Sequence, residues 1–323
     1  MGVATTTVRA VNGLTARWAG VSEDGTAFSA AGVWPLLAHL AGGAEGAARA
    51  ELAEALGLPA AQARDAANEL LAAMSAMRGL DTALGLWTKR TLELREEWEA
   101  GLPADAHGVL TGDPVADHQA LDAWAVKRTA GLIDRMPVTL AEDTEMVLAS
   151  ALTMRTQWLS PFQEVDLETA YEPWAGNVGP GLLVEKVRRT RPESPSLDVT
   201  TVAYHMNASH DLLALHRLFG LTTAQDTSRG HFPGVSDFPL AIGSAKQNIM
   251  ATFGARGFEA AAVTAFGAVA GCVPDLRYVT TRIRAAFDRP FGFLALHRHT
   301  RLVLTAGWVT DPLLLPEYDG EPG

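Results

Sequence analysis

The chain has 323 residues, 48% of them hydrophobic, and a formal net charge of −11 at pH 7. That apolar content can fill a large core in one domain or two, whereas the acidic balance argues against nucleic acid or an anionic membrane surface as a partner, because both require a basic face. The single cysteine, Cys272, excludes an internal disulfide bond. No run of about 20 apolar residues predicts a membrane span. No signal peptide is visible, so we expect a cytoplasmic protein, with export by an unrecognised route left open.

The first half of the chain is predicted to be mainly helical. Hydrophobic periodicity and stop signals predict helices over residues 5–19, 32–44, 47–56, 63–78 and 117–136. A short strand or cap at 27–29 precedes the second of these helices, and TALGLW at 82–87 has the composition of a strand.

The second half is predicted to consist mainly of strands. They are expected at 146–158, at 240–253 and, as IRAAF, FGFLAL and RLVLTAGWV, between 283 and 309. From 163 to 212 the periodicity is poor. Helices followed by strands indicate an α+β fold, and neither an internal repeat nor a linker between two domains is visible.

One stretch late in the chain, GFEAAAVTAFGAVAG at 257–271, fits two structures. As a helix it would be apolar on nearly every side and therefore buried. As a strand it would present alternate residues on opposite faces. Runs rich in Ala favour the helix, but the local pattern leaves both alternatives open.

Six segments along the chain form one ordered pattern. They are Phe28-Ser29 before a helix with AELAEALGL at 50–58, ALGLW at 83–87, LDAWAVKRTAGLI at 121–133, VLASALTMRTQWLSPF at 147–162, LFGLTTAQDTSRGHFPGVS at 218–236 and FDRPFGFLALHRHTRLVLTAGWVTDP at 287–312. Each is weak alone, but in this order they cover most of the chain and resemble the serpin family. The many Arg, Ala and Gly residues are typical of GC-rich bacterial genes, so the chain resembles a shortened bacterial serpin.

The resemblance implies a single serpin-like domain over residues 1–323, with N-terminal helices packed on a large central mixed β-sheet, smaller sheets, and an exposed reactive loop at about 257–282. It also implies an inhibitor of serine proteases rather than an enzyme, with no cofactor and no metal. In this family the protease cleaves the loop, which then inserts as a new strand into the central sheet and carries the attached acyl-enzyme with it. We therefore expect a monomer that can form loop–sheet polymers.

The stretch at 257–271 falls where serpins carry the hinge of this loop. The expected hinge residues are Gly257, Phe258, Glu259, Ala260, Ala261, Ala262, Val263 and Thr264. Glycine permits the backbone change, and small side chains can enter a packed sheet without overpacking it. The spacing of the family places the scissile bond at Gly271–Cys272, and the alternatives are bonds after Leu276, Arg277 or Tyr278. A small residue before the bond favours an elastase-like or subtilisin-like protease as the target.

The resemblance also identifies a sheet-opening region, made of Ser29, Ser150, Trp158 and Gln247. Ser150 and Gln247 align with an Asn and a His of the family, and a Ser–Gln pair can still form a hydrogen bond. Phe258 stands where inhibitors usually carry Thr or Ser, so insertion could be slower. Between 163 and 211 the chain lacks several tens of residues that form strands and helices in the family.

Two alternatives remain open. An enzyme is disfavoured, because Gly-x-Ser-x-Gly, Ser-x-x-Lys, His-Glu-x-x-His and P-loop motifs are all missing from the sequence. His297-x-His299 would place two imidazoles on one strand face, but a solvent-exposed strand end is favoured over a metal pair. The second alternative is a non-inhibitory binding or structural protein on the same fold, which Phe258 and the shortened middle support.

Overall fold

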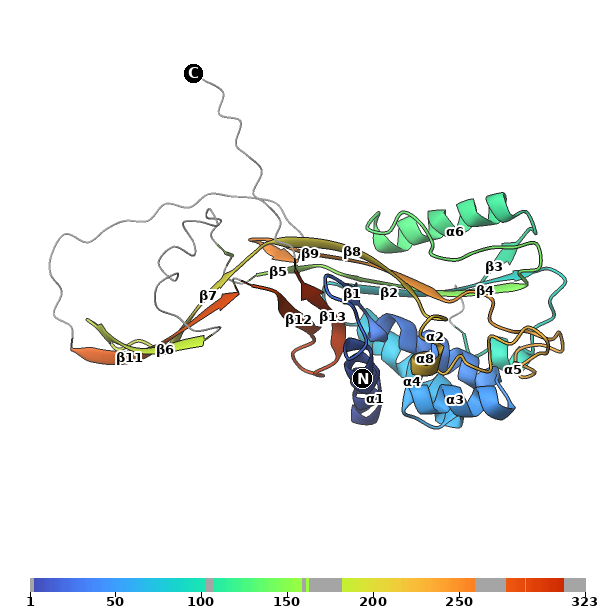
Figure 1. Cartoon of the computed structure of the whole chain (residues 1–323), viewed down its shortest axis with the longest axis horizontal. Coiled ribbons are helices and arrows are strands. Elements are labelled where there is room, and N and C mark those ends of the chain that lie inside the picture. The colour runs from blue at the N-terminus through green and yellow to red at the C-terminus, as the bar shows by residue number, and fades with distance from the viewer. Residues whose placement is uncertain are drawn as a thin grey trace, which may run out of the picture. The chain divides into compact units, whose positions relative to one another are not determined.

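A computed structural model describes residues 3–102, 107–158, 161–162, 182–258, 277–287 and 289–310 (Figure 1). The chain divides into two compact units. Unit 1 comprises residues 1–155, 206–250 and 292–308, and unit 2 comprises residues 156–205, 251–291 and 309–323. Among the described helices, none combines the length and the apolar character that crossing a lipid bilayer requires. A single domain over the whole chain stays a prediction.

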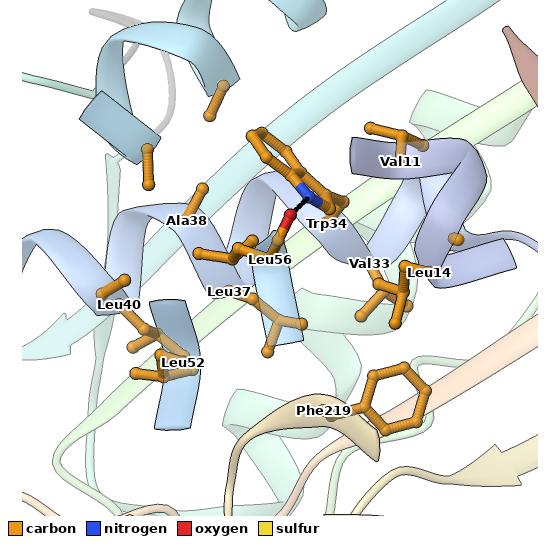
Figure 2. Packing of buried hydrophobic residues seen from close by; sticks show 14 of the residues in the cluster. Val11, Leu14, Val33, Trp34, Leu37, Ala38, Leu40, Leu52, Leu56 and Phe219 are labelled. Carbon is orange, nitrogen blue, oxygen red and sulfur yellow. Dashed lines mark hydrogen bonds between the residues drawn. The ribbon is translucent and has the colours of Figure 1, made fainter. Parts of the chain in front are cut away.

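Unit 1 is built around helix α2 (Ala30–Gly43), which is buried along most of its length. Helices α1 (Thr5–Ala19), α3 (Gly46–Leu56) and α4 (Ala60–Ser75) pack against it. Figure 2 shows side chains of α2, among them Trp34, facing Leu52 and Leu56 of α3. The indole N–H of Trp34 donates to the carbonyl oxygen of Leu56 over 3.1 Å, so this buried ring keeps a polar partner.

The main sheet of unit 1 has the strand order β3-β2-β4. Its strands are β2 (Leu80–Lys89), β3 (His107–Leu110) and β4 (Met146–Met154), with β3 parallel and β4 antiparallel to β2. In β4 the side chains alternate between two apolar layers. Val147 and Ala149 join a cluster with Leu121 of helix α6 (Pro114–Thr129), whereas Leu148 packs on the main core.

Two further ladders and two short helices complete this part of the chain. Strands β8 (Tyr204–Asp211) and β9 (Lys246–Phe253) pair with each other. Strand β13 (Val303–Val309) lies between β1 (Ala27–Phe28) and β12 (Phe291–Leu296). The short helices are α5 (Glu96–Glu99) and α8 (His216–Phe219).

Unit 2 contains two small sheets. Strand β5 (Thr156–Gln157) pairs antiparallel with β10 (Gly257–Phe258). Strand β11 (Tyr278–Phe287) is central in the second sheet. Its neighbours are β6 (Leu182–Arg189), which is antiparallel to it, and β7 (Ser196–Thr201), which is parallel.

The structure confirms the α+β class, and it confirms the bounds of α1 and β12. The prediction of a helix over 117–136 is wrong at both ends. Asp113 starts α6 earlier, because its carboxylate accepts hydrogen bonds from the N–H groups of Val115 and Ala116. The helix ends at Thr129, because Ala130 and Gly131 adopt positive φ angles of 49° and 83°.

Two strand predictions are also corrected. The strand expected over 240–253 is limited to β9, and the one expected over 146–158 divides into β4 and β5. The break falls at Arg155, whose N–H donates to the carbonyl oxygen of Gly79 over 2.7 Å instead of continuing the ladder. The poorly periodic segment 163–212 contains β6, β7 and β8.

Candidate functional site

The first turn of α2 forms the centre of the candidate site. Ser29 caps the helix, because its hydroxyl oxygen accepts from the N–H of Gly32 at 3.1 Å, and the same hydroxyl donates to the carbonyl oxygen of Leu304 at 2.6 Å. The amide of Gln247 on β9 binds the backbone of Ser29 twice, accepting from its N–H and donating to its carbonyl oxygen, each over 2.9 Å. One buried serine therefore joins α2, β13 and β9.

Ser150 of β4 reaches the same turn of α2 from the other side. Its hydroxyl donates to the carbonyl oxygen of Gly32 over 2.6 Å. A Cβ at Gly32 would lie 3.4 Å from Nε2 of Gln247, an ordinary van der Waals distance, so Gln247 also lies beside this turn. The structure thus brings together Ser29, Ser150 and Gln247. The two aligned side chains bond to the start of α2 rather than to each other among the described contacts.

A groove lies between β4 and β9, within unit 1. Its volume is about 680 Å³, and it is lined by residues 146–153 of β4, by residues 246–250 of β9 and by α2 from Gly32 to Leu40. In the described part of the chain, β4 pairs only with β2 and β9 pairs only with β8. The facing edges of these two strands therefore have backbone N–H and C=O groups available to a further strand.

A segment after α6 joins this helix to β9, one side of the groove. The N–H of Met136 donates to Oδ1 of Asp122 over 2.7 Å, which ties the segment to α6. Further along, Nζ of Lys246 on β9 donates to the hydroxyl of Thr139 over 3.2 Å. Nδ2 of Asn248 donates to the carbonyl oxygen of Arg135 over 3.4 Å. Any strand that entered the groove at this level would have to break these contacts.

The beginning of the predicted hinge is described in unit 2. Gly257 pairs with Gln157 across β10 and β5, and a Cβ at Gly257 would clash with the carbonyl oxygen of Thr156. Close backbone approach therefore requires glycine at this position. The turn before it is held by Trp158, whose indole N–H donates to the carbonyl oxygen of Gly254 over 3.0 Å and whose backbone N–H donates to that of Arg256 over 2.8 Å.

Trp158 also anchors an aromatic cluster in unit 2. Its ring centroid lies 5.1 Å from that of Phe253 and 6.1 Å from that of Phe162. Tyr204 stacks on Phe253 at 5.3 Å, and burial raises the pKa of the Tyr204 phenol above its ordinary value. Trp158 belongs to unit 2, whereas Ser29, Ser150 and Gln247 belong to unit 1.

Most of the predicted loop lies outside the described residues. This applies to Glu259, Ala260, Ala261, Ala262, Val263, Thr264, Gly271, Cys272 and Leu276. Arg277 is described, and Tyr278 is the first residue of β11, where it pairs with Arg189. The last five positions of the predicted loop range, 278–282, thus belong to a strand.

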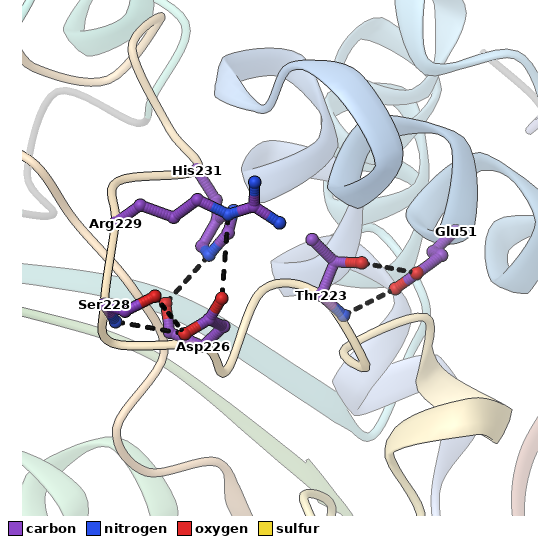
Figure 3. Close-up of polar contacts among 6 residues, drawn as sticks. All are labelled: Glu51, Thr223, Asp226, Ser228, Arg229 and His231. Carbon is purple, nitrogen blue, oxygen red and sulfur yellow. Dashed lines mark hydrogen bonds and ion pairs between the residues drawn. The ribbon is translucent and has the colours of Figure 1, made fainter.

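Polar side chains elsewhere in unit 1 serve the fold. Figure 3 shows Glu51 of α3 accepting from both the N–H and the hydroxyl of Thr223, at 2.8 and 2.6 Å. In the same segment Asp226 accepts from Ser228, which lowers the pKa of the Asp226 carboxyl. His231 bonds the backbone carbonyl of Asp226 over 2.9 Å. The contacts of Glu51 attach the segment at 218–236 to α3, and the others brace the segment internally.

The described residues offer no group of three or more His, Cys, Asp or Glu side chains suited to a metal ion. The rings of His297 and His299 are 5.8 Å apart and lie in the turn after β12, which agrees with the favoured placement at a strand end. Nδ1 of His297 bonds the hydroxyl of Thr300 over 2.8 Å.

Sequence reasoning missed the buried imidazole of His39. His39 of α2 is fully buried, and neither of its ring nitrogens has a hydrogen-bond partner in the described structure. Burial, with a smaller contribution from the positive charge of Arg64, lowers the pKa of His39 to about 4. The apolar run around this histidine was the only sequence signal that could have identified it as buried.

Comparison with known proteins decides the family. The family model for serpins, described as serine protease inhibitors, matches residues 6–178. The chain belongs to the serpin family. Membership places it with protease inhibitors and their relatives rather than with enzymes. A serine proteinase inhibitor of Cavia porcellus is 23% identical to this serpin over 290 residues, covering 72% of this chain and 68% of that protein. Serpin-Z6A of Oryza sativa subsp. japonica is 31% identical over 152 residues, 43% of this chain and 39% of the rice protein.

Solved structures agree on the fold. The serpin is similar to the thermophilic serpin tengpin in its native state, with a TM-score of 0.71 and 14% identity over 95% of this chain and 94% of tengpin. It is also similar to thyroxine-binding globulin in complex with thyroxine, with a TM-score of 0.68 and 17% identity over 95% of this chain and 99% of the globulin. At such identities the likeness shows the fold alone, and one fold can host different functions.

Proposed function

We propose that this serpin inhibits serine proteases as a suicide substrate. The hydroxyl of the protease serine attacks the carbonyl carbon before the scissile bond, which forms an acyl-enzyme ester and releases the new amino terminus. The cut loop then enters the groove between β4 and β9 as an added strand. The observation that carries the proposal is this groove, whose two strand edges both face a space of about 680 Å³.

The composition of the loop supports insertion. From Glu259 to Thr264 the side chains are small, apart from Glu259 itself. In an extended strand they alternate, so one set would face the floor of the groove and the other would face away. Gly257 starts this segment at a position where the backbone approaches Thr156 too closely for any Cβ. A small residue at Gly271, before the proposed bond to Cys272, suits an elastase-like or subtilisin-like protease.

The test mixes the purified serpin with elastase, subtilisin and trypsin and separates the products on denaturing gels. A covalent adduct is expected with elastase or subtilisin, and sequencing the released C-terminal peptide locates the bond. Trypsin addresses the alternative bond after Arg277. Clean cleavage without an adduct would contradict inhibition and would favour a non-inhibitory protein, for which Phe258 at the hinge and the shortened middle are the supporting observations.

Matched variants separate insertion from simple cleavage. Ala260→Arg with Ala262→Arg changes one face of the extended segment, and Ala261→Arg with Val263→Arg changes the other. One pair should lose the adduct while still being cleaved, since two buried cations cannot be accommodated in the core. The other pair should keep the adduct. Equal behaviour of both pairs argues against strand insertion.

A further inference from the structure

The groove between β4 and β9 is lined largely by apolar side chains that the protein covers only in part. Half-buried members of this lining are Leu36, Leu132, Ile133, Met136, Leu148, Leu152 and Ile249. Close-packed protein interiors leave few spaces larger than a water molecule, whereas this groove has a volume of about 680 Å³. Pockets for small molecules commonly have volumes of about 300–1,000 Å³ and mostly apolar walls. The size and the lining of the groove therefore fit a small apolar ligand.

One wall of the groove follows helix α2. Val33, Leu36, Leu37 and Leu40 line it, and their spacing places all four side chains on one face of the helix, here called the α2 wall. At about 1.5 Å per residue, the interval from Val33 to Leu40 spans about 10 Å. An extended apolar chain lying along the α2 wall can contact all four side chains, so the shape favours an elongated ligand over a compact one.

Polar side chains lie in the part of the groove where α2 begins. Gln247 of β9 bonds the backbone of Ser29 there, and the residue before it, Lys246, also lines the groove. Nζ of Lys246 donates to the hydroxyl of Thr139 over 3.2 Å, and the hydroxyl of Ser244 accepts from the N–H of Thr139 over 3.4 Å. An ammonium group and two hydroxyl groups therefore lie beside the apolar lining.

The charge of Lys246 is not matched by a carboxylate among the described ion pairs. Of the described residues that line the groove, Lys246 alone is positively charged, and it bonds the neutral hydroxyl of Thr139. Two carboxylates also line the groove. Glu145 pairs with Lys89 at 2.9 Å, and Asp143 is exposed, so solvent and salt screen its charge. The positive charge of Lys246 therefore favours an anionic group on the ligand.

The side chain of Asn248 supplies a second polar group for such an anion. Two residues after Lys246 in β9, it points to the same side of the strand and lines the groove. Its Oδ1 is buried and has no hydrogen-bond partner in the described structure, and its Nδ2 donates to the carbonyl oxygen of Arg135 over 3.4 Å. Buried polar atoms are rarely left without partners. An amide held by one long hydrogen bond can turn and present an N–H to an anion beside Lys246.

We propose that the groove binds an elongated apolar carboxylate, with the chemistry of a fatty-acid anion. The carboxylate accepts hydrogen bonds from Nζ of Lys246 and from the hydroxyl of Ser244. The tail lies along the α2 wall. Burial of the tail supplies most of the affinity, about fourfold for each methylene group removed from water, and the charge of Lys246 selects an acid over an alcohol of the same length.

One consequence of this site rests on the proposed function. An inserted loop strand and the apolar tail would occupy the same groove, so each excludes the other. A serpin whose cut loop has inserted should no longer bind the carboxylate, and a saturating carboxylate should lower the yield of the covalent adduct. Binding to the uncleaved serpin requires no protease, so the lack of an adduct would contradict inhibition and leave the binding result unchanged.

The test is isothermal titration calorimetry of the uncleaved serpin with decanoate, dodecanoate and dodecanol, each below the concentration at which it aggregates. One saturable site is expected. Affinity should rise about tenfold from decanoate to dodecanoate, and dodecanoate should bind more tightly than dodecanol. Lys246→Gln should weaken dodecanoate about threefold and leave dodecanol unchanged. Lys127→Gln on α6 is the matched control, since Lys127 is exposed and lies outside the lining of the groove.

Two further variants test the head and the tail of the ligand separately. Lys246→Glu, a change at an exposed side chain, should reverse the preference, so that dodecylamine binds more tightly than dodecanoate. Leu36→Gln should weaken dodecanoate and dodecanol alike, whereas Val126→Gln on α6, at a side chain 42% exposed and outside the groove lining, should weaken neither. The proposal is overturned if dodecanoate shows no saturable binding. It is equally overturned if Lys246→Gln and Lys246→Glu bind dodecanoate as tightly as the unmodified serpin does.

Discussion

Replacing Gln247 with alanine should destabilise unit 1 more than its half-exposed position suggests. The change removes both hydrogen bonds to the backbone of Ser29. It leaves the buried N–H of Ser29 without its described partner, at a cost of about 1–3 kcal/mol, and it removes a second bond contributing about 0.5–1.5 kcal/mol. The carbonyl oxygen of Ser29 keeps a partner in the N–H of Val33 at 3.4 Å. The expected total loss in the free energy of unfolding is about 2–4 kcal/mol.

The measurement is urea unfolding followed by tryptophan fluorescence. Trp18, Trp34 and Trp98 are almost completely buried in unit 1, so their emission reports on this part of the chain. Ser150→Ala is the matched comparison. It removes one hydrogen bond to Gly32 and should cost only about 0.5–1.5 kcal/mol.

Two results would refute this reasoning. One is a Gln247→Ala variant within about 0.5 kcal/mol of the unmodified serpin, the usual range for surface changes without such contacts. The other is a Ser150→Ala variant that loses more stability than Gln247→Ala. In either case the double contact to Ser29 would not be what holds β9 to α2.

Substitutions at three other residues test the pH dependence of stability and the packing of the backbone. His39→Met should raise stability at pH 7, because a buried imidazole without partners is replaced by an apolar side chain. Between pH 6.5 and 4 the folded serpin binds fewer protons at His39 than the unfolded chain, so its free energy of unfolding decreases by about 3 kcal/mol as the pH is lowered through this range. Denaturant titrations should show that the variant lacks this loss. For Asp117, burial would raise its carboxyl pKa, but hydrogen bonds from Thr111 and Gly112 outweigh it and lower that pKa. Asp117→Asn should therefore cost about 1–3 kcal/mol at pH 7, and the difference should vanish as acid protonates the carboxylate below its ordinary pKa of 3.8. Gly257→Ala should open β10 from β5, because its Cβ meets the carbonyl oxygen of Thr156; unchanged hydrogen exchange in these strands would contradict the clash.

Hydrophobic periodicity in the sequence predicted the helices and strands whose bounds are set by nearby residues. The helix at Thr5–Ala19 and the strand at Phe291–Leu296 have a clear periodicity, and their predicted bounds are confirmed. The end of α6 was missed, because it depends on a non-glycine residue, Ala130, adopting a positive φ. The helix propensity of alanine does not predict a positive φ, which non-glycine residues rarely adopt.

Strands that depend on distant partners were harder to predict. In β6 the sequence LLVEKVRR mixes charged and apolar residues on both faces, and its partner β11 lies far along the chain. Such a strand is stabilised by its backbone ladder with β11, a distant pairing that is not visible in the local sequence.

In the candidate site, too, the sequence predicted part of the arrangement and missed the rest. Resemblance selected Ser29, Ser150 and Gln247, and the structure brings these three together. A direct Ser150–Gln247 bond is not among the described contacts, because alignment gives positions but not the direction of a side chain. Both side chains instead bond backbone groups at the start of α2. Ser150 donates to the carbonyl oxygen of Gly32, and Gln247 accepts from the N–H of Ser29 and donates to its carbonyl oxygen.

The contacts of Ser29 have a consequence for the order in which the protein can be built during synthesis. Leu304, whose carbonyl oxygen accepts from the Ser29 hydroxyl, lies 275 residues further along the chain. Gln247, whose amide binds the backbone of Ser29, lies 218 residues further along. The helices around α2 can form early from neighbouring sequence, but the start of α2 is completed only when β13 has left the ribosome. Until then Ser29 lacks its contact with Leu304, although Gln247 is synthesised earlier. A nascent chain interrupted before residue 304 would therefore carry a helical layer with an unfinished sheet, a form that chaperones would hold and proteases would remove.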